Sequence, residues 1–410
     1  MSGRPPVAIV VQRYGADITG GSESLARAVA ERLAVFYDVT VFTTCARDYV
    51  TWRNELPAGE ETLAGVCVRR FPVEEERDLA AFNEFAEPLY LRATTGEEEQ
   101  LFLRRQGPYV PRLVEALGAE RERFVAIVFF TYLYYPTYWG LRAASDRSVL
   151  VPTAHDEPPL RFAIYAEMFA LPKGFAIQTR PEEALVRSRF PIGDRPASVV
   201  GTGVEVEEKP DVEGFHIRYD LDHPYAVYAG RIDAGKGCAE MLAHYERYRR
   251  EVPGAAGLIL IGTLAMPEPR SPGVRYLGYL SEDEKAAALA GARAVICPSP
   301  YESLSIVLLE GMALGTPALA TARSAVLEDH CRRSNAGLWY GDADEFVEGL
   351  DLLVREDRLR TALGENGRAY VREHYRWDAV LLRYRSLIEA VRSTESRGGA
   401  RGSRRTPTDP

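Results

Sequence analysis

Two glutamates eight residues apart, Glu302 and Glu310, could bind the hydroxyl groups of an extended ligand. A short apolar run at 294–297 ends at Pro298, and a segment with helical periodicity continues to Gly315. Glu302 is therefore expected at the carboxyl end of a buried strand and the start of a helix, where open α/β sheets bind ligands. Glu310 would lie two turns along this helix, roughly 12 Å away along its axis.

The alternative is that both glutamates are ordinary solvent-facing carboxylates, which are common on helices. The residues between them are mostly apolar, so the helix is expected to be largely buried. A carboxylate in a buried helix is costly unless it has a partner. This context favours a functional role for the pair.

Two cations, Arg231 and Lys236, form a second candidate group after the apolar run at 225–229. Gly230 ends the expected strand and a helix is expected from Gly237, so both cations would meet a helix N-terminus. Such an arrangement suits a diphosphate. The Gly-Lys-Ser/Thr ending of a Walker loop is absent. The segment alone could equally be a surface turn, but the two glutamates favour an anion site.

Two loops in the first half of the chain are further candidates. Gly20 and Gly21 follow the apolar run at 7–11 and open a predicted helix, where glycine amides can approach a ligand closely, although most such pairs are simple turns. His155 follows a strand predicted at 148–152, with a loop-capping role as the alternative. The Gly-x-Gly-x-x-Gly sequence of dinucleotide sites is missing after the first strand, which argues against a nucleotide-dependent oxidoreductase.

The composition is that of a soluble globular protein with two domains: 410 residues, 46% hydrophobic and 27% charged. A net charge of -9 argues against a nucleic-acid partner, and it weakens docking on an anionic membrane without excluding peripheral contact. Five scattered cysteines without a Cys-x-x-Cys pair predict no disulfide framework and no zinc site, so a cytoplasmic location is expected. The aromatic run at 124–139 contains Pro136 and is too short to cross a membrane.

Strand-like and helix-like segments alternate along both halves of the chain, which predicts an α/β fold with parallel sheets. We expect two tandem Rossmann-like domains. The expected divisions are 1–204 for the first domain, 205–222 for a polar linker, 223–370 for the second domain, 371–391 for a C-terminal helix that packs back on the first domain, and 392–410 for a disordered tail.

The candidate residues form one longer pattern. Gly230-Arg231-x4-Lys236-Gly237 is followed by Glu302-x7-Glu310 and then by Gly311-Met312-Ala313-x-Gly315-x-Pro317. This pattern resembles the family 4 retaining glycosyltransferases of the GT-B fold, the glycosyl transferases group 1. The resemblance is strongest over 225–320. It implies two Rossmann-like domains with a cleft between them, and a nucleotide-diphosphate-sugar donor held mainly by the second domain.

The resemblance also implies a role for each candidate residue. Arg231 and Lys236 would neutralise the diphosphate as it leaves. Glu302 would bind hydroxyls of the donor sugar and Glu310 the ribose diol. His155 would donate or accept a hydrogen bond near the transferring sugar, which completes a catalytic set of His155, Arg231, Lys236 and Glu302. The remaining implied contacts are the amides of Ser303, Leu304 and Ser305 and the loop of Gly20 and Gly21 to the donor, and Asp156 or Glu157 to the acceptor.

Members of this family usually need no metal, and we expect neither a metal nor another cofactor. The acceptor is left open between a lipid-linked glycan, a growing glycan and a small metabolite, at a cytoplasmic location that includes the inner membrane face. Gly201-Thr202-Gly203-Val204-Glu205 departs from the Asn-Gly-Val-Asp usual at the domain junction. A non-catalytic GT-B relative that binds sugar nucleotides remains the first alternative, and an oxidoreductase the second.

Overall fold

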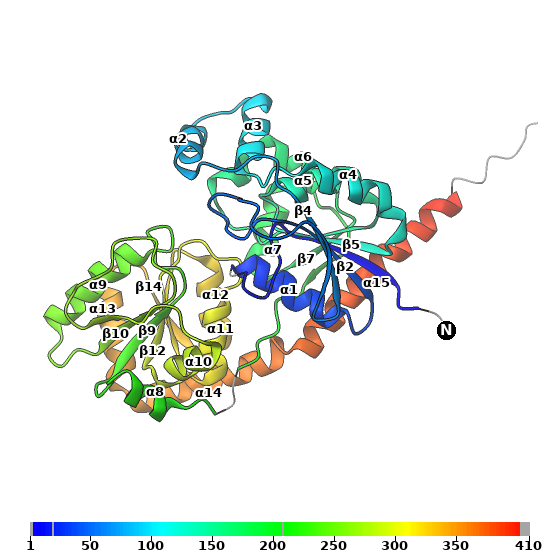
Figure 1. The fold of residues 1–410 in the computed structure, drawn as a ribbon. Coiled ribbons are helices and arrows are strands. Elements are labelled where there is room, and N and C mark those ends of the chain that lie inside the picture. The colour runs from blue at the N-terminus through cyan, green and yellow to red at the C-terminus, as the bar shows by residue number, and fades with distance from the viewer. Residues whose placement is uncertain (1–2, 19, 207–208, 402–410) are drawn as a thin grey trace, which may run out of the picture. The chain divides into compact units, whose positions relative to one another are not determined.

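The structure, a computed structural model, describes residues 3–18, 20–206 and 209–401, with side chains up to residue 393. The chain forms two compact units, which we call unit 1 (Met1–Val200 and Leu381–Pro410) and unit 2 (Gly201–Val380). Each unit has one sheet with helices on its faces (Figure 1). The α/β fold with two Rossmann-like sheets predicted from the sequence is confirmed.

The sheet of unit 1 has eight strands in the order β3-β4-β2-β1-β5-β6-β7-β8, and only β3 runs antiparallel to its neighbour. The central strands are buried on both faces, which explains their continuous apolar sequences. The strands are β1 (Pro6–Val10), β2 (Asp38–Thr44), β3 (Gly59–Leu63), β4 (Val66–Phe71), β5 (Ala126–Phe130), β6 (Ser148–Val151), β7 (Gly174–Ile177) and β8 (Ala197–Val199).

The helices of unit 1 that precede the crossover to unit 2 are α1 (Gly21–Leu33), α2 (Leu79–Leu89), α3 (Gly96–Gln106), α4 (Pro111–Glu120), α5 (Tyr135–Ala143), α6 (Ala163–Phe169) and α7 (Arg180–Arg189), with short 3-10 turns η1 (Arg121–Arg123), η2 (Ser145–Arg147) and η3 (Pro158–Arg161). α4, α5 and α6 share one core cluster with β1, β5 and β6. α1 and α15 (Trp377–Arg401) lie on the opposite face of this sheet (Figure 1).

Unit 2 has a six-stranded, all-parallel sheet in the order β11-β10-β9-β12-β13-β14. Its elements are α8 (Val212–Arg218), β9 (Tyr225–Ala229), α9 (Cys238–Glu251), β10 (Gly257–Ile261), β11 (Val274–Tyr276), α10 (Glu282–Gly291), β12 (Ala294–Cys297), α11 (Ile306–Leu314), β13 (Ala318–Thr321), α12 (Ala325–Ser334), β14 (Gly337–Tyr340), α13 (Ala343–Arg355) and α14 (Asp357–His374). α9 and α13 pack on one face, and α10, α11 and α12 on the other.

The predicted linker at 205–222 is wrong over much of its length because it contains α8. The Asp211 carboxylate accepts a hydrogen bond of 2.8 Å from the amide of Gly214 and so caps this helix. Phe215 is buried in the same core cluster as α10, and Tyr219 and Leu221 pack against that cluster, so this segment is part of unit 2. Residues 207 and 208 lie outside the described residues.

The C-terminal helix predicted over 371–391 spans parts of two helices, α14 and α15, which are separated at Tyr375 and Arg376. In unit 1, Leu387 and Val391 of α15 lie against Gly174, where an added Cβ would stand 2.8 Å from Val391. α15 continues to Arg401, so the expected disorder is wrong for 392–401; once a helix has formed, each further residue adds a hydrogen bond. The rest of the predicted tail, 402–410, lies outside the described residues.

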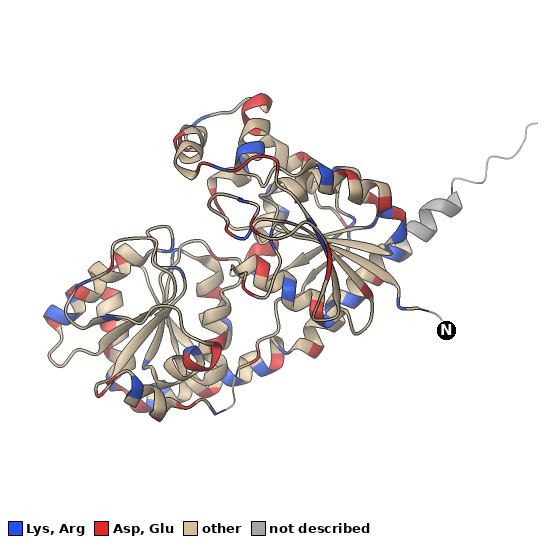
Figure 2. Cartoon of the chain, in the orientation of Figure 1, with Lys and Arg blue, Asp and Glu red and all other residues tan. Residues whose placement is uncertain are grey.

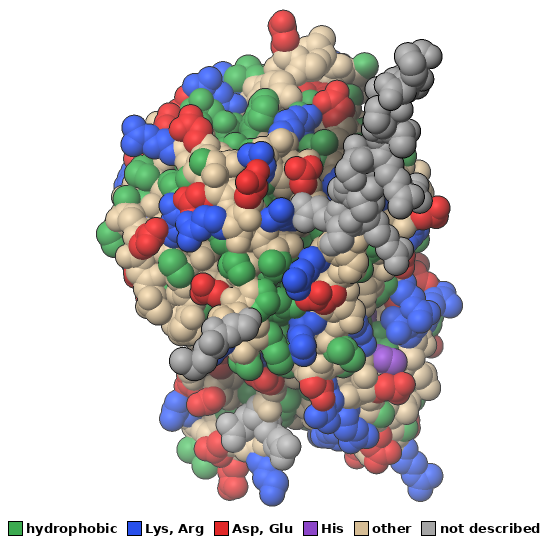
Figure 3. Space-filling view, turned by 90° about the vertical axis from the view of Figure 1, so that its right-hand side faces the viewer, with side chains coloured by type: hydrophobic (Ala, Val, Ile, Leu, Met, Phe, Trp, Pro, Cys, Tyr) green, Lys and Arg blue, Asp and Glu red, His purple; other side chains and the backbone are tan. Residues whose placement is uncertain are grey.

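Charged residues of both signs are interspersed along the helices of both units (Figure 2). On the face drawn in Figure 3, basic, acidic and apolar side chains are likewise mixed. Neither view shows the continuous basic surface that is typical of nucleic-acid binding. None of the described helices combines the length and the apolar sequence needed to cross a bilayer.

Candidate functional site

The strand order of unit 2 defines a switch point between β9 and β12. From β9 the chain builds outward through β10 and β11, and it then returns to the other side of β9 as β12. Ligands of open α/β sheets bind at the carboxyl ends of the strands beside such a point. The two loops that leave these strand ends, 230–237 and 298–305, carry most of the predicted donor-site residues.

The first loop holds Arg231 and Lys236 through one carboxylate. The guanidinium of Arg231 forms an ion pair with Asp233, and the amide of Lys236 donates a hydrogen bond of 2.8 Å to the other oxygen of Asp233. The hydroxyl of Tyr228 donates to the carbonyl oxygen of Arg231 at 2.6 Å. Asp233 and Tyr228, which the sequence did not single out, therefore order the loop that presents both cations.

The two loops touch at Gly237, the residue before α9. Gly237 has φ 73°, and a Cβ at this position would overlap the carbonyl oxygen of Pro298. This close approach brings the Nζ atom of Lys236 to 2.9 Å from Oε1 of Glu302, with side chains 35% and 17% exposed. Two residues predicted to bind one ligand, 66 positions apart in the sequence, thus form an ion pair.

Glu302 itself lies outside the helix, so the predicted two-turn spacing to Glu310 is wrong. Ser305 has φ 66° in the left-handed region, and α11 begins only at Ile306. The side chain of Ser305 makes no capping hydrogen bond to the helix. The left-handed turn therefore separates a loop that carries Glu302 from a helix that carries Glu310.

Glu310 combines burial with an unused acceptor. Its Oε1 atom lies 3.1 Å from Nζ of Lys285, which also pairs with Glu282 at 2.6 Å. Among the described residues, no group makes a hydrogen bond to Oε2 of Glu310, although this oxygen is buried. Burial raises the pKa of Glu310, and Lys285 opposes that rise. A ligand hydroxyl would satisfy this oxygen, as the ribose contact requires.

A buried histidine that we did not assign from the sequence supports the second loop. His330 on α12 is fully buried, and its Nε2 atom lies 3.0 Å from the carbonyl oxygen of Leu304. Its Nδ1 atom lies 3.1 Å from the hydroxyl of Tyr370 on α14. Burial lowers the pKa of His330 to about 4, so the ring is neutral near pH 7. No spacing of histidines in the sequence could have indicated this contact.

In unit 1, Gly20 and Gly21 open α1 at the carboxyl end of β1, as predicted. Gly20 has φ 148°, and a Cβ there would overlap the carboxylate of Glu23. That carboxylate forms a buried ion pair of 2.6 Å with Arg13, whose side chain is 6% exposed. The glycine is therefore required by the packing of this ion pair, whatever it also offers to a ligand.

His155 lies in the loop after β6, and two carboxylates, those of Glu157 and Glu182, order this loop. The Nε2 atom of His155 lies 3.3 Å from Oε2 of Glu157, and the hydroxyl of Tyr132 donates to the other oxygen of Glu157 at 2.6 Å. The buried carboxylate of Glu182 accepts hydrogen bonds of 2.6 Å from the amides of Ala154 and Gln178. Burial raises the pKa of Glu182 to about 7.

The two residues predicted to contact an acceptor are thus engaged within unit 1. The carboxylate of Glu157 contacts His155 and accepts a hydrogen bond from Tyr132. Asp156 forms an ion pair of 2.6 Å with Arg189, and its side chain is 57% exposed. Their role toward an acceptor stays a prediction. Among the described residues, no three His, Cys, Asp or Glu side chains gather in a way that could hold a metal ion.

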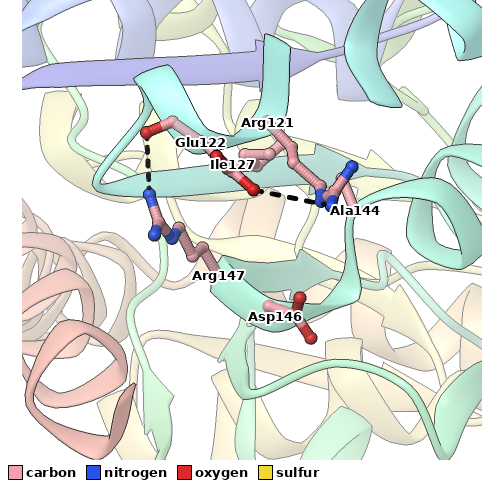
Figure 4. Close-up of a pocket in the computed structure, with 6 residues that line it drawn as sticks. All are labelled: Arg121, Glu122, Ile127, Ala144, Asp146 and Arg147. Carbon is pink, nitrogen blue, oxygen red and sulfur yellow. Dashed lines mark hydrogen bonds and ion pairs between the residues drawn. The ribbon is translucent and has the colours of Figure 1, made fainter. Parts of the chain in front are cut away.

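A cavity of about 140 Å³ lies in unit 1, at the amino ends of β5 and β6 (Figure 4). Arg147 crosses it to donate a hydrogen bond of 3.0 Å to the carbonyl oxygen of Glu122. Because parallel sheets bind ligands at the opposite, carboxyl edge, this cavity is not a candidate for the donor site.

Comparison with known proteins shows which family the second half of the chain resembles. Residues 215–370 match the family of glycosyl transferases group 1. The D-inositol 3-phosphate glycosyltransferase of Frankia alni is 27% identical over 392 residues, which cover 88% of this chain and 92% of that protein. Over residues 215–370 the chain is thus similar to the glycosyl transferases group 1. The matched region contains both donor loops and α11.

Two further comparisons give a relative over part of the chain and a structure with the same fold. The phosphatidyl-myo-inositol mannosyltransferase of Propionibacterium freudenreichii is 32% identical over 133 residues, 32% of this chain and 34% of that protein. The structure of sucrose-phosphate synthase from Thermosynechococcus elongatus aligns with a TM-score of 0.74 at 19% identity, over 95% of this chain and all of that one. The fold is GT-B.

Proposed function

We propose that this glycosyltransferase transfers a sugar from a nucleotide-diphosphate-sugar donor to a hydroxyl-bearing acceptor, with retention of the anomeric configuration and without a metal, as in family 4. The observation that carries the proposal is the pairing of Lys236 with Glu302 at the β9–β12 switch point. Lys236 is a cation that can bind phosphate, and Glu302 can accept hydrogen bonds from sugar hydroxyls. They lie side by side where the bond between the sugar and the diphosphate of the donor would be.

Donor binding would replace the ion pair by ligand contacts. Lys236 and Arg231 would form ion pairs with the diphosphate oxygens, and the sugar hydroxyls would donate hydrogen bonds to Glu302. Negative charge grows on the diphosphate as the bond to the sugar breaks, so fixed cations here stabilise the transition state more than the ground state. The ordering of Arg231 by Asp233 would lower the cost of assembling this site.

Glu310 would hold the other end of the donor. Its buried Oε2 atom has no hydrogen-bond partner among the described residues, and a ribose hydroxyl of the nucleotide would donate a hydrogen bond to it. The ion pair with Lys285 would keep Glu310 charged and oriented before the ligand arrives. The amides of Ser303, Leu304 and Ser305 would add hydrogen bonds to the diphosphate.

The chemical step would need no nucleophile from the protein. The acceptor oxygen would attack the anomeric carbon from the face that the diphosphate leaves, its proton would pass to a phosphate oxygen, and the bond from carbon to phosphate oxygen would break. His155 would contribute a hydrogen bond near the transferring sugar, and Gly20 and Gly21 would lie beside the donor phosphates. These contributions from unit 1 rest on the family pattern.

The comparisons suggest where to look for substrates. Relatives are named for an inositol 3-phosphate and for phosphatidyl-myo-inositol, so a polyol that carries phosphate, free or lipid-linked, is the acceptor class to try first. A structural neighbour from Anabaena was solved with UDP and glucose, which makes UDP-sugars the first donors to try. We propose a cytoplasmic enzyme, with peripheral contact to a membrane if the acceptor is a lipid.

The test is turnover with a panel of UDP-, GDP- and ADP-sugars. Lys236→Met and Glu310→Gln should suppress the donor-dependent product, whereas Lys173→Met, an exposed lysine of unit 1, should leave it unchanged. Full activity in both site variants would contradict the proposal. Tight donor binding without turnover on any acceptor would instead favour a non-catalytic GT-B relative, and binding of NAD(P) would favour an oxidoreductase.

A further inference from the structure

Three buried side chains form a hydrogen-bonded series beneath the second donor loop. It runs from Tyr375 through Tyr370 to His330 and ends at the carbonyl oxygen of Leu304. The successive distances are 3.4, 3.1 and 3.0 Å. All three side chains are at most 5% exposed. A series that ends on the main chain of a ligand-binding loop is placed to fix the orientation of that loop.

The direction of each hydrogen bond follows from the chemistry of its last member. A carbonyl oxygen only accepts, so Nε2 of His330 carries the proton and donates to Leu304. The ring is neutral, and Nδ1 is then an acceptor for the hydroxyl of Tyr370. The hydroxyl of Tyr370 can in turn accept from Tyr375. The series thus selects one tautomer of His330, the one that donates to the donor loop.

The planar peptide group transmits this constraint to the ligand side. In a trans peptide the carbonyl oxygen of Leu304 and the amide hydrogen of Ser305 point in opposite directions. Holding the carbonyl toward His330 therefore turns the amide of Ser305 away from the core. Ser305 has φ 66°, a conformation that a serine rarely adopts without support from its surroundings.

We infer that His330 is a positioning residue for donor binding: it holds the Leu304–Ser305 peptide so that the Ser305 amide faces the donor diphosphate. This inference rests on the proposed function, since it requires a diphosphate at that loop. It assigns Tyr370 the role of fixing the tautomer of His330. Neither residue touches the donor itself.

Two amide substitutions separate the positioning role from simple packing. The side-chain nitrogen of Gln can take the place of Nε2, whereas that of Asn takes the place of Nδ1 and falls short of Leu304. Isothermal titration of the full chain with UDP, GDP and ADP should show His330→Gln within about threefold of the unsubstituted protein. His330→Asn should bind roughly tenfold more weakly, the loss expected for one hydrogen bond to a charged group.

Equal affinities in the two variants, whether both intact or both reduced, would overturn the inference and leave the proposed function standing. If the unsubstituted protein binds none of the three nucleotides, the proposed function fails and the inference fails with it. Should the variants not fold, ¹⁵N NMR of the histidine rings provides a second test. We expect His330 as the neutral Nε2–H tautomer at pH 7, and the Nδ1–H tautomer would overturn the inference.

Discussion

Replacing Glu310 by Gln should weaken nucleotide binding strongly while leaving the fold intact. Glu310 is 12% exposed, and its Oε1 atom is occupied by Lys285 at 3.1 Å. In the variant, the amide oxygen would remain toward Lys285, and the nitrogen would replace the buried Oε2 atom. A nitrogen that only donates cannot accept a hydrogen bond from a ribose hydroxyl.

The expected magnitudes follow from these contacts. A hydrogen bond to a charged group contributes about 1.5–3 kcal/mol, so the dissociation constant for a nucleoside diphosphate should rise roughly 10- to 100-fold. The free energy of unfolding should change by less than about 1 kcal/mol, or rise, because the substitution removes a buried charge and Lys285 keeps Glu282.

The assay is isothermal titration with UDP, GDP and ADP, paired with urea unfolding. Glu282→Gln is the matched control, since Glu282 pairs with the same lysine but is 74% exposed. The control should retain the affinity of the unsubstituted protein. Glu310 does not bind the ribose if Glu310→Gln binds as tightly as the unsubstituted protein, or if Glu282→Gln loses as much affinity as Glu310→Gln.

Three further predictions concern other parts of the site. Burial raises the pKa of Glu182 from 4.5 to about 7, so protonated Glu182 stabilises the fold fully below pH 4.5. This stabilisation, on the order of 3 kcal/mol, is lost as the pH rises through 7. The free energy of unfolding in urea, measured from pH 4.5 to 8, should therefore depend less on pH in Glu182→Gln, and an unchanged slope would contradict this. Gly237→Ala should lower the free energy of unfolding by on the order of 2 kcal/mol and weaken UDP binding. The control is Gly254→Ala, at φ 72° with no atom within 4 Å of the added Cβ, which should cost about 1 kcal/mol and leave UDP binding unchanged. Equal losses of stability and of UDP affinity in the two variants would argue against the contact with Pro298. Tyr132→Phe removes the hydrogen bond to Glu157 and should lower the free energy of unfolding in urea by about 1 kcal/mol. It should also reduce turnover more than it raises the donor KM. An unchanged turnover would show that Glu157 does not position His155 for the reaction.

The parallel strands and most donor-site residues could be predicted from the sequence because their signals are local. Apolar runs such as 225–229 and 294–297 are buried on both faces of a sheet, and the glycines and prolines that end them mark the loops. Lys236 and Glu302 follow two such runs. Their pairing requires that β9 and β12 are neighbours in the sheet, and it also requires the close approach of Gly237 to Pro298.

The misses share a physical cause, which is contact between residues distant in the sequence. Nothing near His330 indicates that its ring meets Leu304, because α12 and the donor loop come together only in the folded sheet. The helix α8 was missed because its segment is mostly polar and packs through a few side chains, of which Phe215 is buried and Tyr219 and Leu221 are partly buried. The first residue of α11 was predicted wrongly because the helix begins only after Ser305, which has a left-handed conformation. Serine rarely adopts that conformation, so the residue type does not predict it.

The central claim is that this chain transfers a sugar from a nucleotide-diphosphate donor with retention. The most direct measurement is ¹H NMR of the reaction with α-linked UDP-, GDP- and ADP-sugars, in the presence of EDTA and a panel of polyol phosphate acceptors. We predict release of one nucleoside diphosphate together with a product whose anomeric coupling constant is that of the α-linkage. A β-linked product, or activity that EDTA abolishes, would contradict it.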